Sequence, residues 1–128
     1  MHFLLLQIIV FVIARNVAIC VLHQVNNFTV QRGGTVYIMA SINNKVLYTG
    51  VTSDLFGRVQ QHKQKLYPES FTARYNCIKL VYFETYSTID EAIDEEKRIK
   101  GGSRSGKEKL VNAINPGWRD LWEEIKDW

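Results

Sequence analysis

The sequence predicts an α+β domain in which a small three-stranded, antiparallel-type sheet is flanked by helices. β-branched and aromatic residues gather in three short runs, which is typical of strands. Apolar residues recur at helical spacing between and after these runs. Of the 128 residues, 46% are hydrophobic and only two are prolines, so we expect one compact domain rather than disorder. The expected element order is ββαβααα.

The first two strands are predicted over residues 35–42 and 46–51, which are rich in β-branched and aromatic side chains. Residues 43–45, Asn-Asn-Lys, predict the turn between them, because asparagine tolerates positive φ. The two strands should therefore pair as a hairpin. Thr52 or Ser53 is expected to cap the helix that follows.

The first helix is predicted from one continuous face at helical spacing: Leu55, Val59, His62 and Leu66. Residues 67–70, Tyr-Pro-Glu-Ser, should end it. A loop that contains Phe71, Arg74 and Tyr75 then leads to the third strand, predicted over residues 78–85.

The second helix should open at Thr88, which forms a capping box with Glu91. Its apolar stripe consists of Ile89, Ala92, Ile93 and Ile99, and the paired glycines 101–102 should end it. A second capping box, Ser105 to Glu108, predicts a helix that runs to about residue 114. Asn115 and Pro116 then turn the chain into a last short helix with Leu121, Trp122 and Ile125 directed inward.

Charge is concentrated in two basic stretches, although the net charge is only +3. Residues 97–109 hold six basic side chains against one acidic, and residues 56–82 hold five against one. Such stretches can present a basic face to a polyanion, or they can be ordinary solvated helix faces. Cys20 and Cys77 lie far apart and match no metal-binding spacing, which is typical of reduced thiols in a cytoplasmic protein.

Glu96 interrupts the apolar stripe of the second helix, whereas Asp94 and Glu95 should face outward. A buried lone carboxylate is costly unless it is paired or binds a metal. One alternative is a salt bridge to an arginine in the core. The other is Mg²⁺, which one carboxylate can hold if water and a phosphate oxygen complete the octahedron.

Tyr37 and Tyr48 lie on paired strands, so the hairpin could bring both hydroxyls to one face. The ordinary alternative is that both rings pack against a helix. Arg58 and His62 are i, i+4 neighbours and can point toward one site, although His62 could equally be a hydrogen-bonded histidine of the core.

Four segments of residues 34–128 closely resemble the small single-domain members of the GIY-YIG nuclease family. They are Thr35-Val36-Tyr37, Tyr48-Thr49-Gly50, the R-x-x-x-H pair, and the A-x-x-x-E-x-x-x-K helix from Ala92 to Lys100. The segment from Asn115 to Trp118 also resembles the family's N-P-x-W. The chain departs from the family pattern at three places. It has TVY where the family has GIY and YTG where the family has YIG, and it has Val51 where some members have lysine.

The resemblance implies a role for each matching residue of the catalytic centre. Tyr37 would activate the attacking water, Tyr48 would position water or phosphate, and Gly50 would permit close approach. Arg58 would stabilise the charged transition state, and His62 would orient Tyr37 or take its proton. Glu96 would be the only protein ligand of Mg²⁺ or Mn²⁺.

Outside that centre, the resemblance implies that Arg104 and Lys107 contact DNA phosphates. It also implies an asparagine at the edge of the site, for which Asn115 and Asn112 are both candidates. We therefore expect a Mg²⁺-dependent DNA endonuclease without a small-molecule cofactor. The alternative is a catalytically silent nucleic-acid-binding module of the same fold. Roles in DNA repair, mobile elements or restriction remain open.

Residues 1–33 are expected to be an apolar extension that precedes the domain. Small family members begin only a few residues before the first tyrosine strand, so the segment could reflect an upstream translation start, with Val30 as the true start. It could instead be a membrane anchor, since residues 3–22 are mostly apolar, but Arg15 would cost about 2.5–3.5 kcal/mol there. A packed extra helix or strand is the third alternative. We favour the first and do not expect a membrane partner.

Overall fold

The protein folds around a three-stranded antiparallel sheet with strand order β2-β1-β3. The computed structural model describes residues 33–127. The strands are β1 (Gly34–Ser41), β2 (Leu47–Thr52) and β3 (Cys77–Tyr86). β1 lies in the middle and is buried along its whole length. The predicted α+β class, the hairpin and the antiparallel sheet are confirmed.

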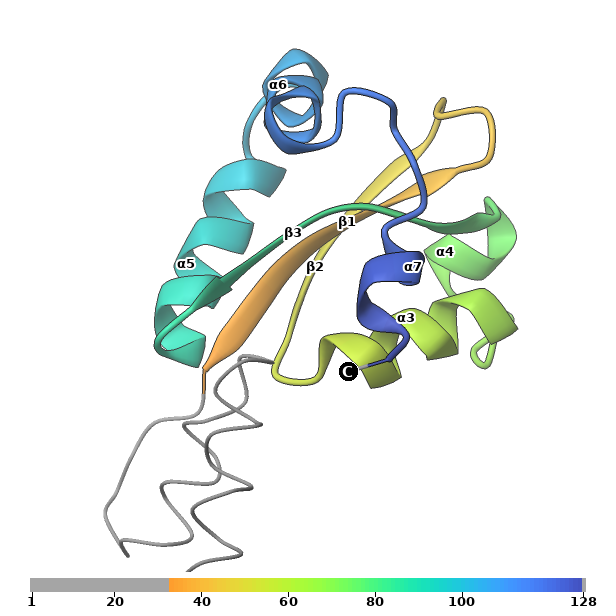
Figure 1. Cartoon of the computed structure of the whole chain (residues 1–128), viewed down its shortest axis with the longest axis horizontal. Helices are drawn as coiled ribbons and strands as arrows, with labels where there is room; N and C mark the ends of the chain where they lie inside the picture. The colour runs from red at the N-terminus through yellow and green to blue at the C-terminus, as the bar shows by residue number, and fades with distance from the viewer. Residues whose placement is uncertain (1–32, 128) are drawn as a thin grey trace, which may run out of the picture.

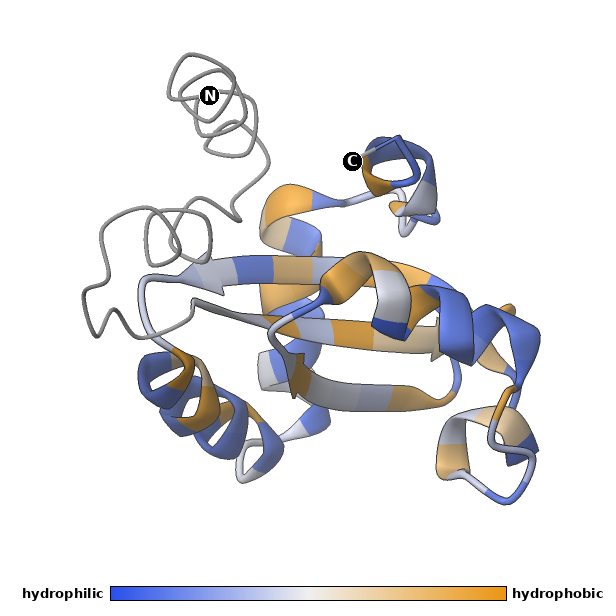
Figure 2. Ribbon diagram, turned by 90° about the horizontal axis from the view of Figure 1, so that it is seen from below, coloured by the Kyte–Doolittle hydropathy of each residue, from blue (hydrophilic) through white to orange (hydrophobic). Residues whose placement is uncertain are grey.

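Helices cover both faces of the sheet (Figure 1). One face packs against α5 (Ile89–Lys100) and α6 (Arg104–Ile114). The other packs against α3 (Leu55–Gln64) and α7 (Trp122–Ile125), with the short helix α4 (Phe71–Arg74) beside β3. When the ribbon is coloured by hydropathy, apolar residues gather along the strands and polar residues alternate with them on the helices (Figure 2).

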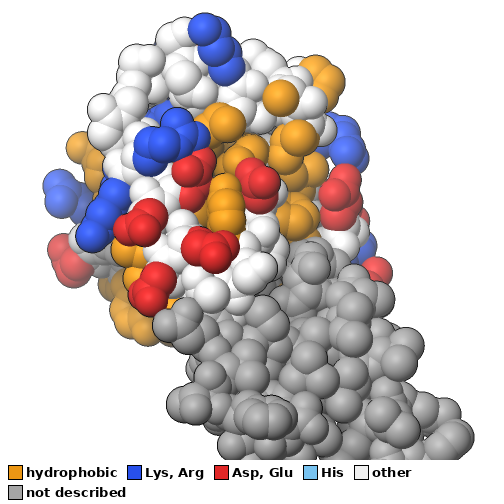
Figure 3. Space-filling view, turned by 90° about the vertical axis from the view of Figure 1, so that its left-hand side faces the viewer, with side chains coloured by type: hydrophobic (Ala, Val, Ile, Leu, Met, Phe, Trp, Pro, Cys, Tyr) orange, Lys and Arg blue, Asp and Glu red, His pale blue; other side chains and the backbone are white. Residues whose placement is uncertain are grey.

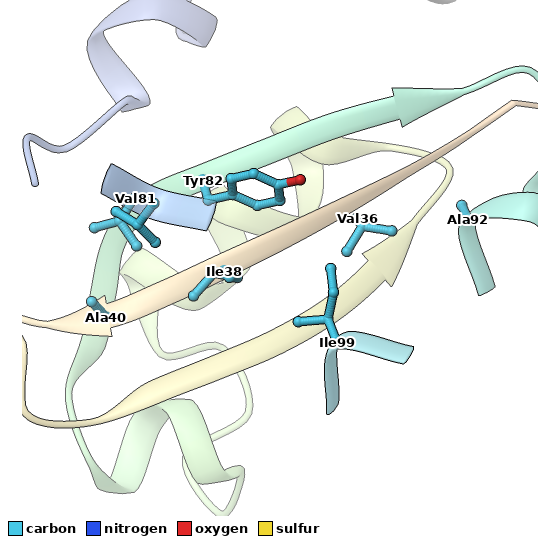
Figure 4. Packing of buried hydrophobic residues seen from close by; sticks show 8 residues of the cluster. Val36, Ile38, Ala40, Val81, Tyr82, Ala92 and Ile99 are labelled. Atoms are coloured by element: carbon cyan, nitrogen blue, oxygen red, sulfur yellow. The ribbon is translucent and has the colours of Figure 1, made fainter. Parts of the chain in front are cut away.

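The alternation of side chains along β1 divides the core into two clusters. Val36, Ile38 and Ala40 face α5 and α6 (Figure 4), whereas Tyr37 and Met39 face α3 and α7. This period of two is what a central strand buried on both faces requires. Tyr37 therefore lies on the α3 face because of its register in β1.

A shift of register between β1 and β3 places two consecutive residues on one face. Ile38 pairs with Tyr82, and Met39 pairs with Leu80, so Val81 is the extra residue. Val81 and Tyr82 both join the cluster under α5 and α6 (Figure 4). A bulge of this kind re-aims side chains without ending the strand pairing.

Local capping decides where the helices begin, and the sequence predicted only some of these caps. Thr88 caps α5 as predicted, since its Oγ1 accepts a hydrogen bond from the Glu91 amide at 3.2 Å. The predicted cap of α3 is wrong. Asp54 caps that helix and accepts from the Gly57 amide at 3.0 Å, while Thr52 Oγ1 hydrogen-bonds the Asp54 backbone instead.

The predicted start of α6 is also wrong. Ser103 is its cap and accepts from the Gly106 amide at 3.1 Å. Glu108, which was expected to complete a capping box, pairs with Arg104 along the helix surface at 2.8 Å. A serine two residues earlier can satisfy the first free amides equally well, so sequence alone did not discriminate between the two caps.

The end of α3 differs from the prediction as well. Lys65 adopts φ 52° and reverses the chain, so Leu66 lies beyond the helix and is 52% exposed. The expected loop at residues 71–75 contains the additional helix α4, whose cap Ser70 accepts from the Ala73 amide at 3.3 Å. The observed order is therefore ββααβααα, with one short helix more than predicted.

The segment before α7 ties the C-terminal part of the chain to β3. The Leu80 amide donates to Oδ1 of Asp120 at 3.1 Å, and the Leu121 amide donates to the Leu80 carbonyl at 2.7 Å. Leu121 and Ile125 are buried as predicted. These bonds cover part of an edge that would otherwise present unpaired backbone groups.

The predictions for residues 1–32 lie outside the described residues, so the boundary proposed at residues 33–34 stays a prediction. Within residues 33–127, no helix is long and apolar enough to cross a membrane. Cys77 is a buried free thiol, whereas Cys20 lies in the part that is not described.

Candidate active site

Tyr37 is placed at the candidate site by the hairpin. It is 1% exposed, and the residue opposite it on β2 is Gly50. A Cβ atom at Gly50 would lie 2.5 Å from Cζ and from the hydroxyl oxygen of Tyr37. Since real Cβ atoms do not approach so closely, glycine at position 50 provides the space that the Tyr37 ring occupies.

His62 links Tyr37 to helix α4. It comes from α3, and its Nε2 lies 2.9 Å from the Tyr37 hydroxyl oxygen. Its Nδ1 lies 2.9 Å from Oγ1 of Thr72, which is buried. Both ring nitrogens therefore have a hydroxyl partner, and the nitrogen that carries the proton donates while the other accepts.

The surroundings keep both members of this pair uncharged at neutral pH. Burial, reinforced by Tyr48 and Glu96 and opposed by Arg58, raises the pKa of the Tyr37 phenol well above its usual range. Burial, and then the positive charge of Arg58, lower the pKa of His62 to about 4. A protonated phenol therefore faces an unprotonated imidazole, which can accept the phenolic proton.

Tyr48 and Arg58 line a cleft in front of this pair, together with His62 and Thr72. The cleft has a volume of about 170 Å³. The Tyr48 ring lies 6.2 Å from the Tyr37 ring and 5.6 Å from the His62 ring, centroid to centroid. Arg58 is exposed, and its guanidinium donates no hydrogen bond to any residue between 33 and 127. It is thus available to an anion in the cleft.

Glu96 is the buried carboxylate that the sequence singled out. It is 7% exposed, whereas Asp94 is exposed and Glu95 pairs with Arg98. Nζ of Lys100 lies 2.6 Å from Oε1 of Glu96, and this ion pair raises the pKa of Lys100. Among the described residues, Lys100 is the only partner of that buried oxygen. The expected alternative, a core arginine, is not its partner.

Helix α5 brings Glu96 to the tyrosines across the free edge of β2. The helix covers the face opposite Tyr37, but β2 is an outer strand of the sheet. Nζ of Lys100 lies 6.0 Å from the centroid of the Tyr48 ring. The charge of Glu96 also contributes to the raised pKa of Tyr37. The Tyr37 phenol of β1 is therefore in contact with the His62 imidazole of α3, and the charges of Arg58 from α3 and Glu96 from α5 are close enough to act on that phenol.

Arg104 and Lys107 lie apart from this cleft, at the start of α6. The Arg104 guanidinium donates to the carbonyl oxygens of Lys45 and Asn44 at 2.6 and 2.5 Å, which fastens α6 to the β1–β2 turn. Nζ of Lys107 lies 3.5 Å from the carbonyl oxygen of Gly102. Neither side chain contributes to the cleft that Tyr48 and Arg58 line.

Asn115 lies in the core, and its amide is fully used by backbone groups. It is 2% exposed, and Nδ2 donates to the carbonyls of Val81 and Arg119 at 3.0 and 2.9 Å. Its Oδ1 accepts from the Arg119 amide at 3.0 Å. The alternative residue, Asn112, accepts from Nε1 of Trp118 at 2.7 Å. The core position of Asn115 argues against direct contact with a substrate, whereas Asn112 is exposed and stays a candidate for the edge of the site.

Two contacts of the site were not predicted from the sequence. Thr72 pairs with His62 only because α4 folds back over α3. No sequence pattern around Thr72 predicts this contact. Lys100 had a usable signal, since residues at i and i+4 on a helix are neighbours and Glu96 precedes it by four.

The predicted basic face is not seen on the α5 side of the molecule. There, acidic and basic side chains lie next to one another around exposed apolar groups (Figure 3). Exposed acidic residues on α5 include Asp90, Glu91 and Asp94. The positive charge at the candidate site comes instead from Arg58 and Lys65, which line the cleft.

Comparison with known proteins finds relatives of this chain. A UPF0213 protein of Syntrophus aciditrophicus is 33% identical over 81 residues, which is 63% of this chain and 91% of the relative. A UPF0213 protein of Staphylococcus epidermidis is 37% identical over 76 residues, 59% of this chain and 90% of its own. The solution structure of the UPF0213 protein BH0048 from Bacillus halodurans covers 70% of this chain and 93% of its own, with 26% identity and a TM-score of 0.45.

The family profile described as the GIY-YIG catalytic domain matches residues 33–110, which is more than half of the chain. That stretch contains all three strands and the candidate site residues Tyr37, Arg58, His62 and Glu96. The chain therefore belongs to the GIY-YIG family.

Proposed function

We propose that this protein is a divalent-metal-dependent DNA endonuclease that hydrolyses phosphodiester bonds. One observation carries the proposal: the Tyr37 hydroxyl lies 2.9 Å from Nε2 of His62, close to the charges of Arg58 and of the buried Glu96. Membership of the GIY-YIG family supports the same reaction class. We expect it to act in the cytoplasm, where its free thiol Cys77 would remain reduced.

Glu96 is the residue that would hold Mg²⁺ or Mn²⁺. Its buried Oε1 has only the half-exposed Lys100 ammonium as a partner among the described residues, and a metal ion could take the place of that cation. Within residues 33–127, no cluster of three or more His, Cys, Asp or Glu side chains could hold a metal alone. Water and a phosphate oxygen would therefore supply the other ligands, and the bound ion would act as a Lewis acid on the phosphate.

The Lys100 side chain would move away from Glu96 when a metal ion binds. Its side chain is 54% exposed, so it can leave Glu96 for solvent without creating a buried charge of its own. Tyr37 and Glu96 are both nearly inaccessible in the described structure. Movement of Lys100 would therefore open the carboxylate at the edge of β2.

Tyr37 and His62 would carry the proton of the attacking water. Because burial holds the phenol in its protonated form, Tyr37 can accept a proton only as it passes its own to Nε2 of His62. Thr72 would accept from Nδ1–H and thereby keep the lone pair on Nε2. The water oxygen then bonds to phosphorus as the bond from phosphorus to the leaving sugar oxygen breaks.

Arg58 would stabilise the charge that develops on the phosphate. Its guanidinium is a planar donor that can contact two phosphate oxygens at once, and it lies one helical turn before His62. Tyr48 would position the phosphate or the water from the other strand, and Gly50 would leave room for Tyr37. Arg104 and Lys107 would contact DNA phosphates away from the cut, so that affinity depends on salt more than on sequence.

A plasmid-nicking assay with Mg²⁺ tests this proposal. Glu96→Gln should lower the rate by about 100-fold or more, because the metal loses its only side-chain ligand. Glu95→Gln is the matched control, since it changes an adjacent carboxylate of α5 whose partner is Arg98. The control should cut at the wild-type rate, and removal of metal with a chelator should stop wild-type cutting.

A catalytically silent nucleic-acid-binding module is the rival function, and Val51 favours it, because some family members have a lysine at that position. Wild-type protein that binds DNA but never nicks it would support the rival. Nicking that Glu96→Gln leaves unchanged would also reject the assignment of Glu96.

A further inference from the structure

Three aromatic rings form a row that begins in the candidate active site and runs onto the surface. Tyr48 and Phe71 are stacked, with ring centroids 6.2 Å apart and an interplanar angle of 29°. Phe71 and Tyr75 follow at 4.6 Å and 41°. Tyr48 lines the catalytic cleft, so the row is continuous with it.

The outer two rings of this row are exposed to solvent, although helix α4 buries the residues between them. Phe71 is 46% exposed and Tyr75 is 48% exposed. Between them, Thr72 and Ala73 are 2% and 9% exposed, so α4 packs its other side against the protein. Neighbouring exposed aromatic rings are costly to leave in water, which marks them as a binding surface.

Basic side chains flank these rings on both sides. Phe71 lines the catalytic cleft together with Arg58 and Lys65. Tyr75 lines a second, more open hollow of about 580 Å³, whose rim includes Lys45. Lys65 also hydrogen-bonds Oδ1 of Asn76, the residue after Tyr75. The surface therefore combines positive charge with flat apolar rings.

A nucleic-acid strand with unpaired bases has the matching chemistry, because its backbone supplies anions and its bases supply flat faces. A second apolar protein surface would not use the cations, and a membrane surface would not use the rings as a row. In a duplex the base faces are already stacked on one another, so these rings could reach them only after unpairing, which costs a few kcal/mol per base.

We propose that Phe71 and Tyr75 form a stacking platform for the unpaired bases next to the phosphate held at Arg58, so that the substrate is single-stranded there. This inference rests on the proposed function for the identity of that phosphate. Base stacking on aromatic side chains is sequence-tolerant, so the platform selects strandedness and not sequence. The strand would run from the catalytic cleft across both rings to the hollow beside Lys45.

Fluorescence anisotropy on the full chain in EDTA, where cutting is suppressed, tests the platform. The probes are a dye-labelled oligothymidine and a mixed-sequence duplex of equal length at the same salt concentration. We expect tighter binding of the oligothymidine. Phe71→Ala and Tyr75→Ala should each weaken it by about 10-fold, within the range for loss of one stacked base, while duplex binding changes little.

Two further variants guard against a folding artefact. Phe71→Trp keeps a stacking ring and should retain oligothymidine affinity. Ile114→Ala removes a comparably exposed apolar side chain, 56% exposed on α6, and should change nothing. Thermal melts of all four variants check that the proteins compared are folded. If Phe71→Ala does not fold, Tyr75→Ala alone tests the platform.

The experiments test the stacking platform and the hydrolysis independently of each other. Equal affinity for both probes, or equal losses on both in Phe71→Ala and Tyr75→Ala, would overturn the platform even if the protein nicks DNA. Selective oligothymidine binding in a protein that, with Mg²⁺, cuts neither the plasmid nor the labelled oligothymidine would uphold the platform and reject the hydrolysis.

Discussion

At the scale of single residues, the site depends on a few atoms that cannot be changed independently. The Tyr37 ring occupies the space that a side chain at Gly50 would need. The same phenol is held by His62, and His62 is held in turn by Thr72. A change at any of these positions should therefore move the others.

Gly50→Ala is expected to disable the site without touching a catalytic group. The new Cβ would meet the Tyr37 ring at 2.5 Å, so the ring must shift and its bond to His62 must lengthen. We expect a loss of about 1–3 kcal/mol in unfolding free energy, as for other overpacked cores, and a nicking rate at least about 10-fold lower. Denaturant titration and single-turnover nicking measure the two effects.

The matched control for that change is Gly117→Ala, where a Cβ would meet only Arg119 Cγ at an ordinary 3.6 Å. It should leave both the stability and the rate close to wild type. Equal behaviour of the two alanine variants would contradict the close packing of Tyr37 on Gly50.

His62 should make stability depend on pH in one direction. In the unfolded chain its pKa is about 6.5, and in the folded protein burial and Arg58 lower it to about 4. Between these values the unfolded state binds the proton and the folded state does not, so stability falls as pH falls from 6.5 toward 4.

The measurement compares wild type with His62→Gln by urea unfolding at several pH values across that window. The unfolding free energy of wild type should decline relative to the variant as the pH is lowered. His2 and His23 are present in both proteins and cancel in this difference. A difference that stays constant from neutral pH to about 4 would contradict the lowered pKa of His62.

At the scale of elements, local signals predicted the strands and most helices, but tertiary contacts decided the rest. The hairpin follows from β-branched runs around an Asn-Asn-Lys turn, and Thr88 caps α5 through a bond within four residues. Helix α4 has only four residues and could not be stable alone, so no local pattern predicts it.

The same distinction applies to the site. The positions of Tyr37 and Glu96 could be predicted, since one follows from strand alternation and the other from a break in an apolar stripe. The contact of Thr72 with His62 could not, because it depends on how α4 packs. Asn115 resembled a site residue in sequence, but it satisfies the backbone of β3 and of the turn after α6.

Asn115→Ala should therefore act on the fold and not on the chemistry. It would leave the carbonyls of Val81 and Arg119 without their donor, which costs about 1–3 kcal/mol for each buried group left unpaired. We expect a clearly lower melting temperature and, well below that temperature, a nicking rate close to wild type. A large loss of rate with unchanged stability would return Asn115 to the substrate-binding residues.

At the scale of the whole molecule, the candidate active site lies at one edge of the sheet. The outer strand β2 lets α5, which covers one face, bring Glu96 to tyrosines that belong to the other face. The row of rings from Tyr48 outward begins at the same edge. The described domain can thus combine the proposed phosphate site with the proposed platform for bases.

The central claim is that Tyr37 and His62 act as one proton-transfer unit in phosphodiester cleavage. Single-turnover nicking by Tyr37→Phe, His62→Gln and the double variant tests it most directly. Each single change should slow the reaction by about 100-fold, and the double variant should be no slower than the worse single, because each change already breaks the unit. Losses that multiply to about 10,000-fold would show two independent residues and would contradict the account, as would a wild type that does not cut.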